Sequence, residues 1–244
     1  MQKVALDEMT REEFKMILGD VKAVVVPVGS IEQHGPHLPM GHDLASVVYV
    51  ARKAVERVYP KVILIPPPLN VGISPHHMNW PGTLTVSNET FMNVIFEVCK
   101  SLRKHGICKI ILLNGHGGNV PALRLIGFRI RDELKIKVAV LSYWDLIPKD
   151  LVEKVLEEDA CPGHSGEFET SIALVIYPEL VRKDLIPKGG TRPSYLKFMI
   201  LDQEEICPDG VDLNPSLGSR EKGEKLLEII INELEKYFLK FAEI

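Results

Sequence analysis

Residues able to hold a metal ion gather in one segment near the start of the chain. Between Gly29 and Asp43 lie Glu32, His34 and Asp43 itself, which together offer two carboxylates and an imidazole. Glu32 and His34 are separated by one residue, so both side chains project to the same side of an extended segment. Carboxylates and imidazoles together suit zinc, manganese or iron better than calcium. The segment therefore predicts a site for a divalent transition metal.

A glycine-rich segment, Asn114 to Asn119, offers His116 as a further ligand. Within it, Gly117 and Gly118 let the backbone approach a bound ion or substrate closely. A phosphate-binding loop is an alternative, because glycine-rich loops that precede helices cradle phosphates. The lysine and the Ser/Thr of a P-loop are missing, however, and so is the Gly-x-Ser-x-Gly elbow of a serine hydrolase.

A third segment, from His164 to Thr170, adds a histidine and the carboxylate of Glu167. A helix that begins at Gly166 places Glu167 in its first turn, where the helix dipole favours a carboxylate without any metal. Asp43 has a similar alternative as an ordinary helix N-cap. All three segments, however, follow a predicted strand or open a predicted helix. This shared placement favours one common site over three separate structural roles.

A loop between Gly72 and Thr83 contains His76, His77 and Trp80. The two histidines are candidates for a substrate pocket, because loops carried by a rigid scaffold are where binding residues concentrate. Trp80 either packs on a ligand or pins the loop to the body of the protein.

Alternating strand and helix patterns must position these segments. Apolar β-branched runs predict strands over residues 21–28, 61–65, 109–113 and 137–143, and apolar residues at helical spacing predict helices over 43–59, 88–105, 120–134, 166–176 and 219–241. A polar stretch predicts a further helix around 148–157, and residues 187–216, rich in Pro, Gly and Asp, are expected to be partly irregular. Strands that alternate with helices pair in parallel and carry helices on both faces. We therefore expect an α/β fold, a three-layer α/β/α arrangement with a mainly parallel sheet, in a single domain over residues 1–244. The candidate site then lies at the carboxyl ends of the strands.

Composition narrows the class of protein further. Of the 244 residues 45% are hydrophobic and 25% charged, a balance typical of globular proteins. The net charge of −4 argues against a nucleic-acid partner, and no apolar run reaches the length of a membrane span. The four cysteines are scattered without a Cys-x-x-Cys pair, which predicts neither a disulfide framework nor a thiolate zinc site and favours the reducing cytoplasm.

Four motifs in this order resemble the creatininase family, also called creatinine amidohydrolases. They are Gly29-Ser-Ile-Glu-Gln-His-Gly-Pro-His-Leu-Pro with Asp43, Trp80-Pro-Gly-Thr, Asn114-Gly-His-Gly-Gly-Asn and His164-Ser-Gly-Glu-Phe-Glu-Thr-Ser. The resemblance runs from about Val25 to Arg220. It implies two divalent metal ions per chain, a small-molecule substrate and a homo-oligomer, commonly a hexamer. Carried over to this chain, it implies metal ligands at Glu32, His34, Asp43 and His116, with Asp43 bridging, and a catalytic histidine at His164.

The chain departs from the creatinine-hydrolysing members at Gly118. That position is a metal-binding glutamate in those members, and glycine has no side chain to offer. Relatives with a His-Gly-Gly motif carry a glutamate in the later motif instead. The resemblance therefore leads us to expect that Glu167 supplies the missing ligand.

A second departure concerns the substrate pocket. Trp144 matches one of two family tryptophans that lie near the substrate, whereas Ala160 takes the place of the other. Relatives with this pattern resemble enzymes that remove a formyl group from a pyrimidine nucleotide intermediate or that trim a small peptide. The substrate is thus expected to be a cyclic amide such as creatinine, a formamide or a small peptide.

The reaction expected from these residues is hydrolysis of an unactivated C–N amide bond by metal-activated water. His164 would pass a proton to the departing nitrogen, which a poor amine leaving group requires. Two alternatives from other classes stay open: a non-catalytic metal-binding module, and a phosphate-binding module that needs no metal. The second predicts phosphate affinity that survives chelation.

Overall fold

The computed structural model describes residues 2–158, 163–190 and 199–244, and it is built around a parallel four-stranded sheet. The strands are β1 (Ala23–Val28), β2 (Val62–Leu64), β3 (Lys109–Asn114) and β4 (Lys137–Ser142), in the order β2-β1-β3-β4. Val28 pairs with Asn114, and Asn114 pairs in turn with Ser142. Three strands therefore end at the same level, and the segments that follow them leave the sheet side by side.

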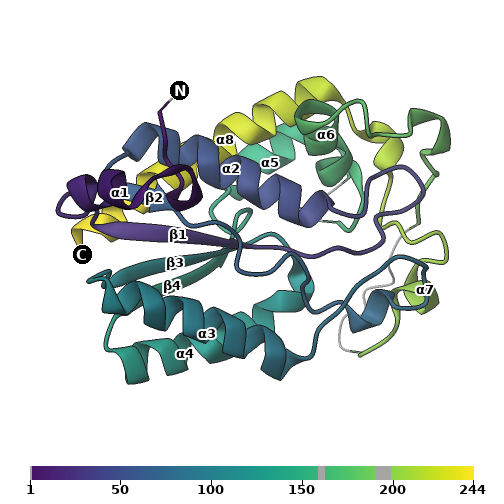
Figure 1. Ribbon diagram of the computed structural model, residues 1–244. Helices are drawn as coiled ribbons and strands as arrows, with labels where there is room; N and C mark the ends of the chain where they lie inside the picture. The colour runs from purple at the N-terminus through teal and green to yellow at the C-terminus, as the bar shows by residue number, and fades with distance from the viewer. Residues whose placement is uncertain (1, 159–162, 191–198) are drawn as a thin grey trace.

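Helices cover both faces of this sheet, as Figure 1 shows. One layer contains α2 (His42–Val58), α5 (Lys149–Val155), α6 (Glu167–Ile176) and α8 (Arg220–Glu243), and the other contains α3 (Asn88–Lys104) and α4 (Val120–Leu134). Successive side chains of β1 point to opposite faces of the sheet, so this strand contributes apolar residues to the core under both helical layers. Ala23 and Val25 pack in the core under α2 and α8, while Val24 and Val26 pack in the core under α3 and α4. The predicted α/β fold with a parallel sheet between helical layers is confirmed.

Two short helices in the described ranges were not predicted from the sequence. One is α1 (Arg11–Ile17), which buries no residue and begins at a capping box between Thr10 and Glu13. The other is α7 (Gln203–Ile206), within the stretch expected to be irregular. Both are too short for apolar periodicity to reveal them.

The order of the strands creates a crevice at their carboxyl ends. The chain runs from β1 outward to β2 and then returns past β1 to β3, so the connections after β1 and β3 diverge to opposite faces. Gly115, directly after β3, lets the first turn of α2 approach, because a Cβ there would lie 2.5 Å from the Asp43 carbonyl oxygen and 2.9 Å from Cβ of Val47. Asp43 is thereby held against the end of the sheet.

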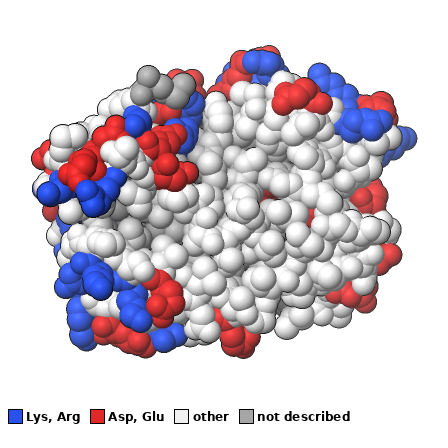
Figure 2. Space-filling view, in the orientation of Figure 1, with Lys and Arg blue, Asp and Glu red and all other residues white. Residues whose placement is uncertain are grey.

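The surface in the view of Figure 2 carries its charged side chains toward the margins, with Lys and Arg interspersed among Asp and Glu. The middle of this face is formed mostly by other residue types, with small areas of Asp or Glu visible between them. None of the described helices is both long enough and apolar enough to cross a membrane.

Candidate metal centre

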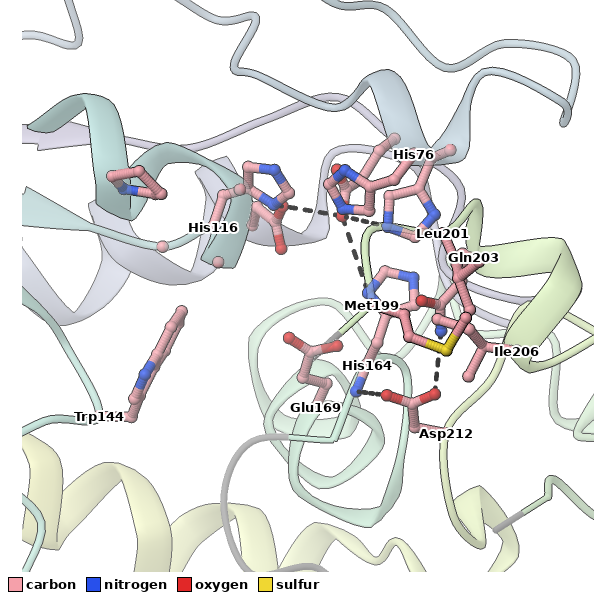
Figure 3. A pocket seen from close by; sticks show the side chains of 17 residues that line it. His76, His116, Trp144, His164, Glu169, Met199, Leu201, Gln203, Ile206 and Asp212 are labelled. Atoms are coloured by element: carbon pink, nitrogen blue, oxygen red, sulfur yellow. Dashed lines mark hydrogen bonds and ion pairs between the residues drawn. The ribbon is translucent and has the colours of Figure 1, made fainter. Parts of the chain in front are cut away.

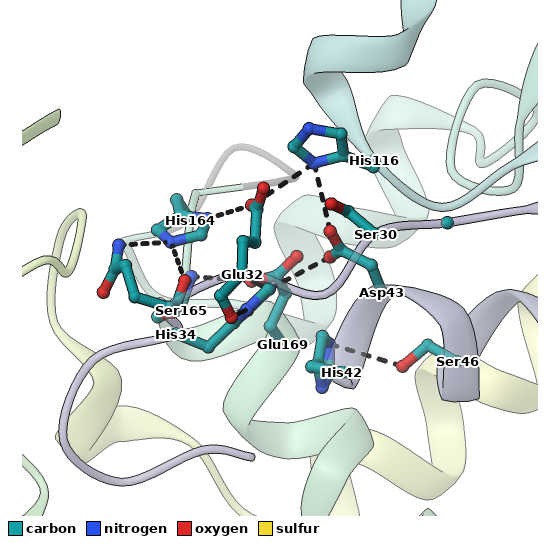
Figure 4. Close-up of polar contacts among 12 residues, drawn as sticks. Ser30, Glu32, His34, His42, Asp43, Ser46, His116, His164, Ser165 and Glu169 are labelled. Carbon is teal, nitrogen blue, oxygen red and sulfur yellow. Dashed lines mark hydrogen bonds and ion pairs between the residues drawn. The ribbon is translucent and has the colours of Figure 1, made fainter. Parts of the chain in front are cut away.

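Four of the predicted ligands meet at the crevice between β1 and β3. Glu32 and His34 lie on the segment between β1 and α2, Asp43 lies in the first turn of α2, and His116 follows β3 (Figure 4). All four side chains are buried, and none is more than 4% exposed. The structure thus brings together Glu32, His34, Asp43 and His116 from the first two of the three segments.

Asp43 stands between the two histidines and faces each with a different oxygen. Its Oδ1 lies 3.0 Å from Nε2 of His34, and its Oδ2 lies 3.0 Å from Nδ1 of His116. Glu32 Oε1 lies 3.2 Å from the same nitrogen of His116. This divides the cluster into a His34 side and a His116 side that share one carboxylate.

Backbone carbonyls orient both histidines. Nδ1 of His34 donates to the carbonyl of Glu32 at 3.1 Å, and Nε2 of His116 donates to the carbonyl of Ile73 at 3.0 Å. Because a carbonyl only accepts, the second ring nitrogen of a neutral histidine must point a lone pair at the carboxylates. Such repulsion is relieved only by a proton or a cation between the groups. Histidines that bind metals typically donate their other N–H to a carbonyl or a carboxylate in this way.

The electrostatics of the cluster favour a bound cation. Burial opposes a positive charge on His34, but Asp43, with help from Glu169 and Glu32, outweighs burial and raises the pKa of His34 to about 10. Glu32 and Asp43 likewise outweigh burial at His116 and hold its pKa well above the usual value. Burial also disfavours the charged form of Asp43, but His34 and His116 lower its pKa below the usual range. The carboxylates therefore stay ionised in a buried place that needs compensating positive charge.

The spacing of the ligand atoms fits an ion of the zinc type. Ligands about 2.0–2.2 Å from a tetrahedral ion lie about 3.4 Å from one another, and the nitrogen–oxygen contacts on the His116 side are 3.0 and 3.2 Å. In addition, Oε2 of Glu32 is buried without a hydrogen-bond partner among the described residues. A buried carboxylate oxygen left without a partner is costly unless it binds a cation. The donor set therefore fits a divalent metal.

Glu167 does not belong to this cluster, which corrects the ligand expected from the sequence. Its carboxylate accepts hydrogen bonds from the backbone N–H groups of Glu157 and Glu158 at 3.0–3.1 Å, and Nζ of Lys222 lies 2.5 Å from its Oε1. Glu167 is fully buried in this arrangement. It pairs α6 with α8 and faces away from the histidines.

Glu169 takes the place expected of Glu167. Its Oε2 lies 3.7 Å from Nε2 of His34 and accepts a hydrogen bond from the backbone N–H of Ser165 at 2.6 Å. His34, His164 and Glu169 each offer a ligand atom within 4.8 Å of the other two. The sequence carried the signal, because Glu167 and Glu169 lie about 200° apart around a helix and only one of them can face the site.

His164 stands at the edge of the cluster with one ring nitrogen turned toward it. Its Nε2 lies 2.9 Å from the carbonyl oxygen of Gln33 and 2.8 Å from the side-chain amide nitrogen of Gln33, while its Nδ1 lies 3.7 Å from Oε1 of Glu32. Burial, with the charge of His34, lowers the pKa of His164 well below its usual value. The histidine is therefore neutral near neutral pH, and the tautomer that donates from Nε2 to the Gln33 carbonyl has a lone pair at Nδ1.

Asp212 and Gln33, which were not predicted as site residues from the sequence, hold His164 in place. The backbone N–H of Asp212 donates to the His164 carbonyl at 2.8 Å, and the Gln33 amide donates to the carbonyl of Gly210 at 3.0 Å and accepts from the N–H of Gly35 at 2.9 Å. Next to His164, Ser165 has a φ of 55°, a strained backbone conformation for a residue with a side chain. Neither the contacts nor the strain has a signal in a single sequence.

A cavity of ≈ 590 Å³ opens onto the cluster (Figure 3). Its described lining includes Glu32, Asp43, His76, His77, Gly115 to Gly118, Pro121, Trp144, His164, Glu169, Met199, Leu201, Gln203, Ile206 and Asp212. Five of the six residues expected to contact substrate lie here: His76, His77, Gly117, Gly118 and Trp144. The sixth, Trp80, lines a neighbouring cavity beside Gln33 and Met40 instead. Ala160 lies outside the described residues.

His37 and His42 point away from the cluster. Nε2 of His37 lies 2.8 Å from Oγ1 of Thr170, and Nδ1 of His42 contacts the hydroxyl of Tyr177. Burial, with the charge of His34, lowers the pKa of both. They support the segments around the site as neutral hydrogen-bonding groups.

Comparisons with known proteins agree on one family. The family model for creatininase, described as creatinine amidohydrolase, matches residues 7–238. A creatinine amidohydrolase of Pseudomonas putida is 30% identical over 94% of both chains. A 2-amino-5-formylamino-6-ribosylaminopyrimidin-4(3H)-one 5'-monophosphate deformylase of Methanothermus fervidus is 27% identical over 86% of this chain and 81% of its own. Two solved structures, named "Creatininase Mn" and a mutant creatininase of Zn-Zn type, each give a TM-score of 0.87 at 27% identity over 98% of both chains.

Proposed function

The chain belongs to the creatininase family and is a metal-dependent hydrolase of C–N bonds, and from this premise we propose that it binds two divalent ions per chain. The observation that carries the proposal is the position of Asp43, whose two oxygens face His34 and His116 separately at 3.0 Å. A carboxylate placed in this way can bridge two ions. Zinc and manganese are the first metals to test, because solved creatininases contain them.

The ligands divide between the two sides of Asp43. On one side, His116 and Glu32 would hold an ion with Oδ2 of Asp43, and on the other, His34 and Glu169 would hold an ion with Oδ1. Each histidine already has its ring fixed by a carbonyl. The residues are therefore preorganised, and little rearrangement is needed on binding.

When bound, such a pair of ions supplies Lewis acidity, which generates a water nucleophile near neutral pH and polarises the amide carbonyl. His164 would transfer the proton that the departing nitrogen requires. In the tautomer that donates from Nε2 to the carbonyl of Gln33, Nδ1 is the atom that takes a proton from the cluster side and gives it to the departing nitrogen of the substrate. Gln33 and Asp212 hold the imidazole of His164 so that its Nδ1 is directed into the cavity.

The cavity supports a substrate with a body larger than creatinine. A volume of ≈ 590 Å³ is typical of sites for ligands of drug size, whereas creatinine is a single five-membered ring. Trp144 and the apolar side chains of Met199, Leu201 and Ile206 line the cavity and offer surface for that body (Figure 3). A formamide or another non-peptide amide carried on a larger molecule is therefore favoured over creatinine itself.

We also propose that the protein is a homo-oligomer in the cytoplasm. The family resemblance implies a hexamer. Leu125 and Phe128 of α4 are 62% and 60% exposed, and an apolar surface of this kind can be buried between copies. Light scattering after size exclusion gives the mass directly, and a monomeric mass at micromolar concentration contradicts the oligomer.

Metal content tests the proposed function. Mass spectrometry of protein purified without chelator should find about two divalent ions per chain. Asp43→Ala should lose both, since it removes the bridge, while an exposed control on the same helix, Glu56→Ala, should retain both. A wild-type chain that takes up no ion after incubation with zinc, manganese or iron would contradict the proposal. The loaded enzyme is then screened on formamides and cyclic amides.

A further inference from the structure

The imidazole of His76 faces that of His116 across the glycine-rich turn after β3. The two rings are nearly parallel, with centroids 5.9 Å apart and planes inclined by 7°. Glu32, His76 and His116 each offer a ligand atom within 4.8 Å of the other two (Figure 3). The interactions of the described residues include no hydrogen bond to the ring of His76. A histidine so close to a buried carboxylate, whose ring packs on His77 but has no hydrogen-bond partner among the described residues, is available to bind an ion.

Gly118 is what lets His76 come this close. A Cβ at position 118 would overlap the carbonyl oxygen of Ile73 and Nε2 of His116, and it would lie 3.0 Å from Cε1 of His76. Any side chain there would push away the segment that carries His76. Because Gly118 has no side chain, the turn leaves room for the side chain of His76 from the neighbouring loop.

Hydrogen bonds on both sides hold this loop segment against His116. The N–H of Ile73 donates to Oδ1 of Asn119 at 2.9 Å, and the carbonyl of Ile73 accepts from Nε2 of His116 at 3.0 Å. Pro75 then opens a 3-10 helix, Pro75–His77, which restricts the backbone next to His76. The position of His76 is thus set by the same residues that orient His116.

We propose that His76 is a metal ligand on the His116 side, where it completes a set with Glu32, Asp43 and His116. This inference rests on the proposed function, because it assumes an ion on that side of Asp43. The ion would then have four protein donors of the carboxylate and imidazole type, and a water or substrate would enter as a fifth ligand, a coordination number that catalytic zinc also reaches. The role differs from substrate contact, because loss of a ligand weakens metal binding even when no substrate is present.

Zinc titration of the full chain separates these roles. Metal-free wild-type protein, His76→Ala and His76→Glu are titrated with Zn²⁺ against a chromophoric chelator, and the affinity of each site is fitted. His105→Ala is the control, because His105 is an exposed histidine at the end of α3 and lies outside the described lining of the cavity. Circular dichroism confirms that each variant is folded.

We expect His76→Ala to weaken one of two zinc sites by at least about tenfold and to leave the other unchanged. His76→Glu, which offers a carboxylate from the same position, should recover most of that loss. His105→Ala should bind as the wild type does. Wild-type affinity at both sites in His76→Ala overturns the inference and leaves the proposed function standing. A wild-type chain with no zinc site overturns the inference, and it overturns the proposed function as well if manganese and iron do not bind either.

Discussion

Two glutamates on one helix show how closely this site depends on the direction of single side chains. Glu167 and Glu169 open α6 together, yet Glu167 pairs with Lys222 of α8 and Glu169 lies beside His34. The helix turns by about 100° per residue, so two positions point them to nearly opposite sides. The same residue type therefore serves stability at one position and, by our proposal, metal binding at the other.

Exchanging each glutamate for glutamine should separate these roles. Glu169→Gln should lose one of two bound ions, since an amide is a weaker ligand than a carboxylate. Glu167→Gln should retain both ions but lower the free energy of unfolding by about 2 kcal/mol, because it weakens charged hydrogen bonds to Lys222 and to backbone N–H groups. Metal analysis and urea unfolding of the metal-free proteins measure the two effects. The opposite pattern would restore Glu167 as the ligand.

His164 should prove necessary for turnover and dispensable for metal binding. Its Nδ1 lies 3.7 Å from Glu32, but its other nitrogen is committed to Gln33. His164→Ala is expected to keep two ions and to lower kcat by about 10²–10⁴-fold, the range typical of a lost proton-transfer group. Metal analysis comes first and steady-state kinetics second. If an ion disappears with the side chain, His164 is a ligand, as its proximity to His34 and Glu169 also allows.

At the level of elements, the site depends on how closely α6 and α8 pack. Gly223 of α8 lies against the backbone of α6: a Cβ there would overlap the carbonyl oxygen of Ser171 and lie 2.8 Å from Cγ2 of Val175. Ser171 strengthens this contact, because its hydroxyl accepts from the N–H of Ser219 at 3.1 Å. The crossing fixes the rotation of α6 and hence the direction in which Glu169 points.

Gly223→Ala should therefore disturb both stability and the site. We expect a loss of about 2 kcal/mol in the free energy of unfolding, the usual cost of overpacking, and weaker binding of the ion beside Glu169. Gly19→Ala is the matched control, because a Cβ at Gly19 meets nothing within 4 Å. Urea unfolding compares the two variants directly. Equal stabilities would show that the crossing tolerates a methyl group and that it does not fix α6.

At the scale of the whole molecule, the proposed ions link parts of the chain that are far apart. Their ligands come from the segment after β1, from α2, from the turn after β3 and from α6. In the unfolded chain these groups are separated, so an ion binds the folded state preferentially and stabilises it. Because Glu32 and Asp43 are buried and negatively charged, the stability of the folded state depends further on a bound ion.

Removing the metal should therefore lower the thermal stability of the protein. Zinc at about one hundred times its Kd adds about 2.7 kcal/mol, which for a chain of this size raises Tm by about 5–10 °C over the chelated protein. Differential scanning fluorimetry with EDTA and with added Zn²⁺ measures the shift. Asp43→Ala should show no shift, and an equal shift in this variant would place the stabilising metal elsewhere.

The sequence by itself determined the α/β fold and most of the cluster, and the reason is local. Periodicity revealed the strands and helices, and parallel strands end at one edge, so residues placed directly after β1 and β3 had to meet. Only the tertiary structure decided which groups joined them. The packing of α6 on α8 selected Glu169 over Glu167, the fit of Ile73 over Gly118 brought His76 to His116, and Trp80 settled beside a different cavity. These choices depend on the rotation of a helix and on the close approach of two loops, and neither is encoded in the spacing of residues along the chain.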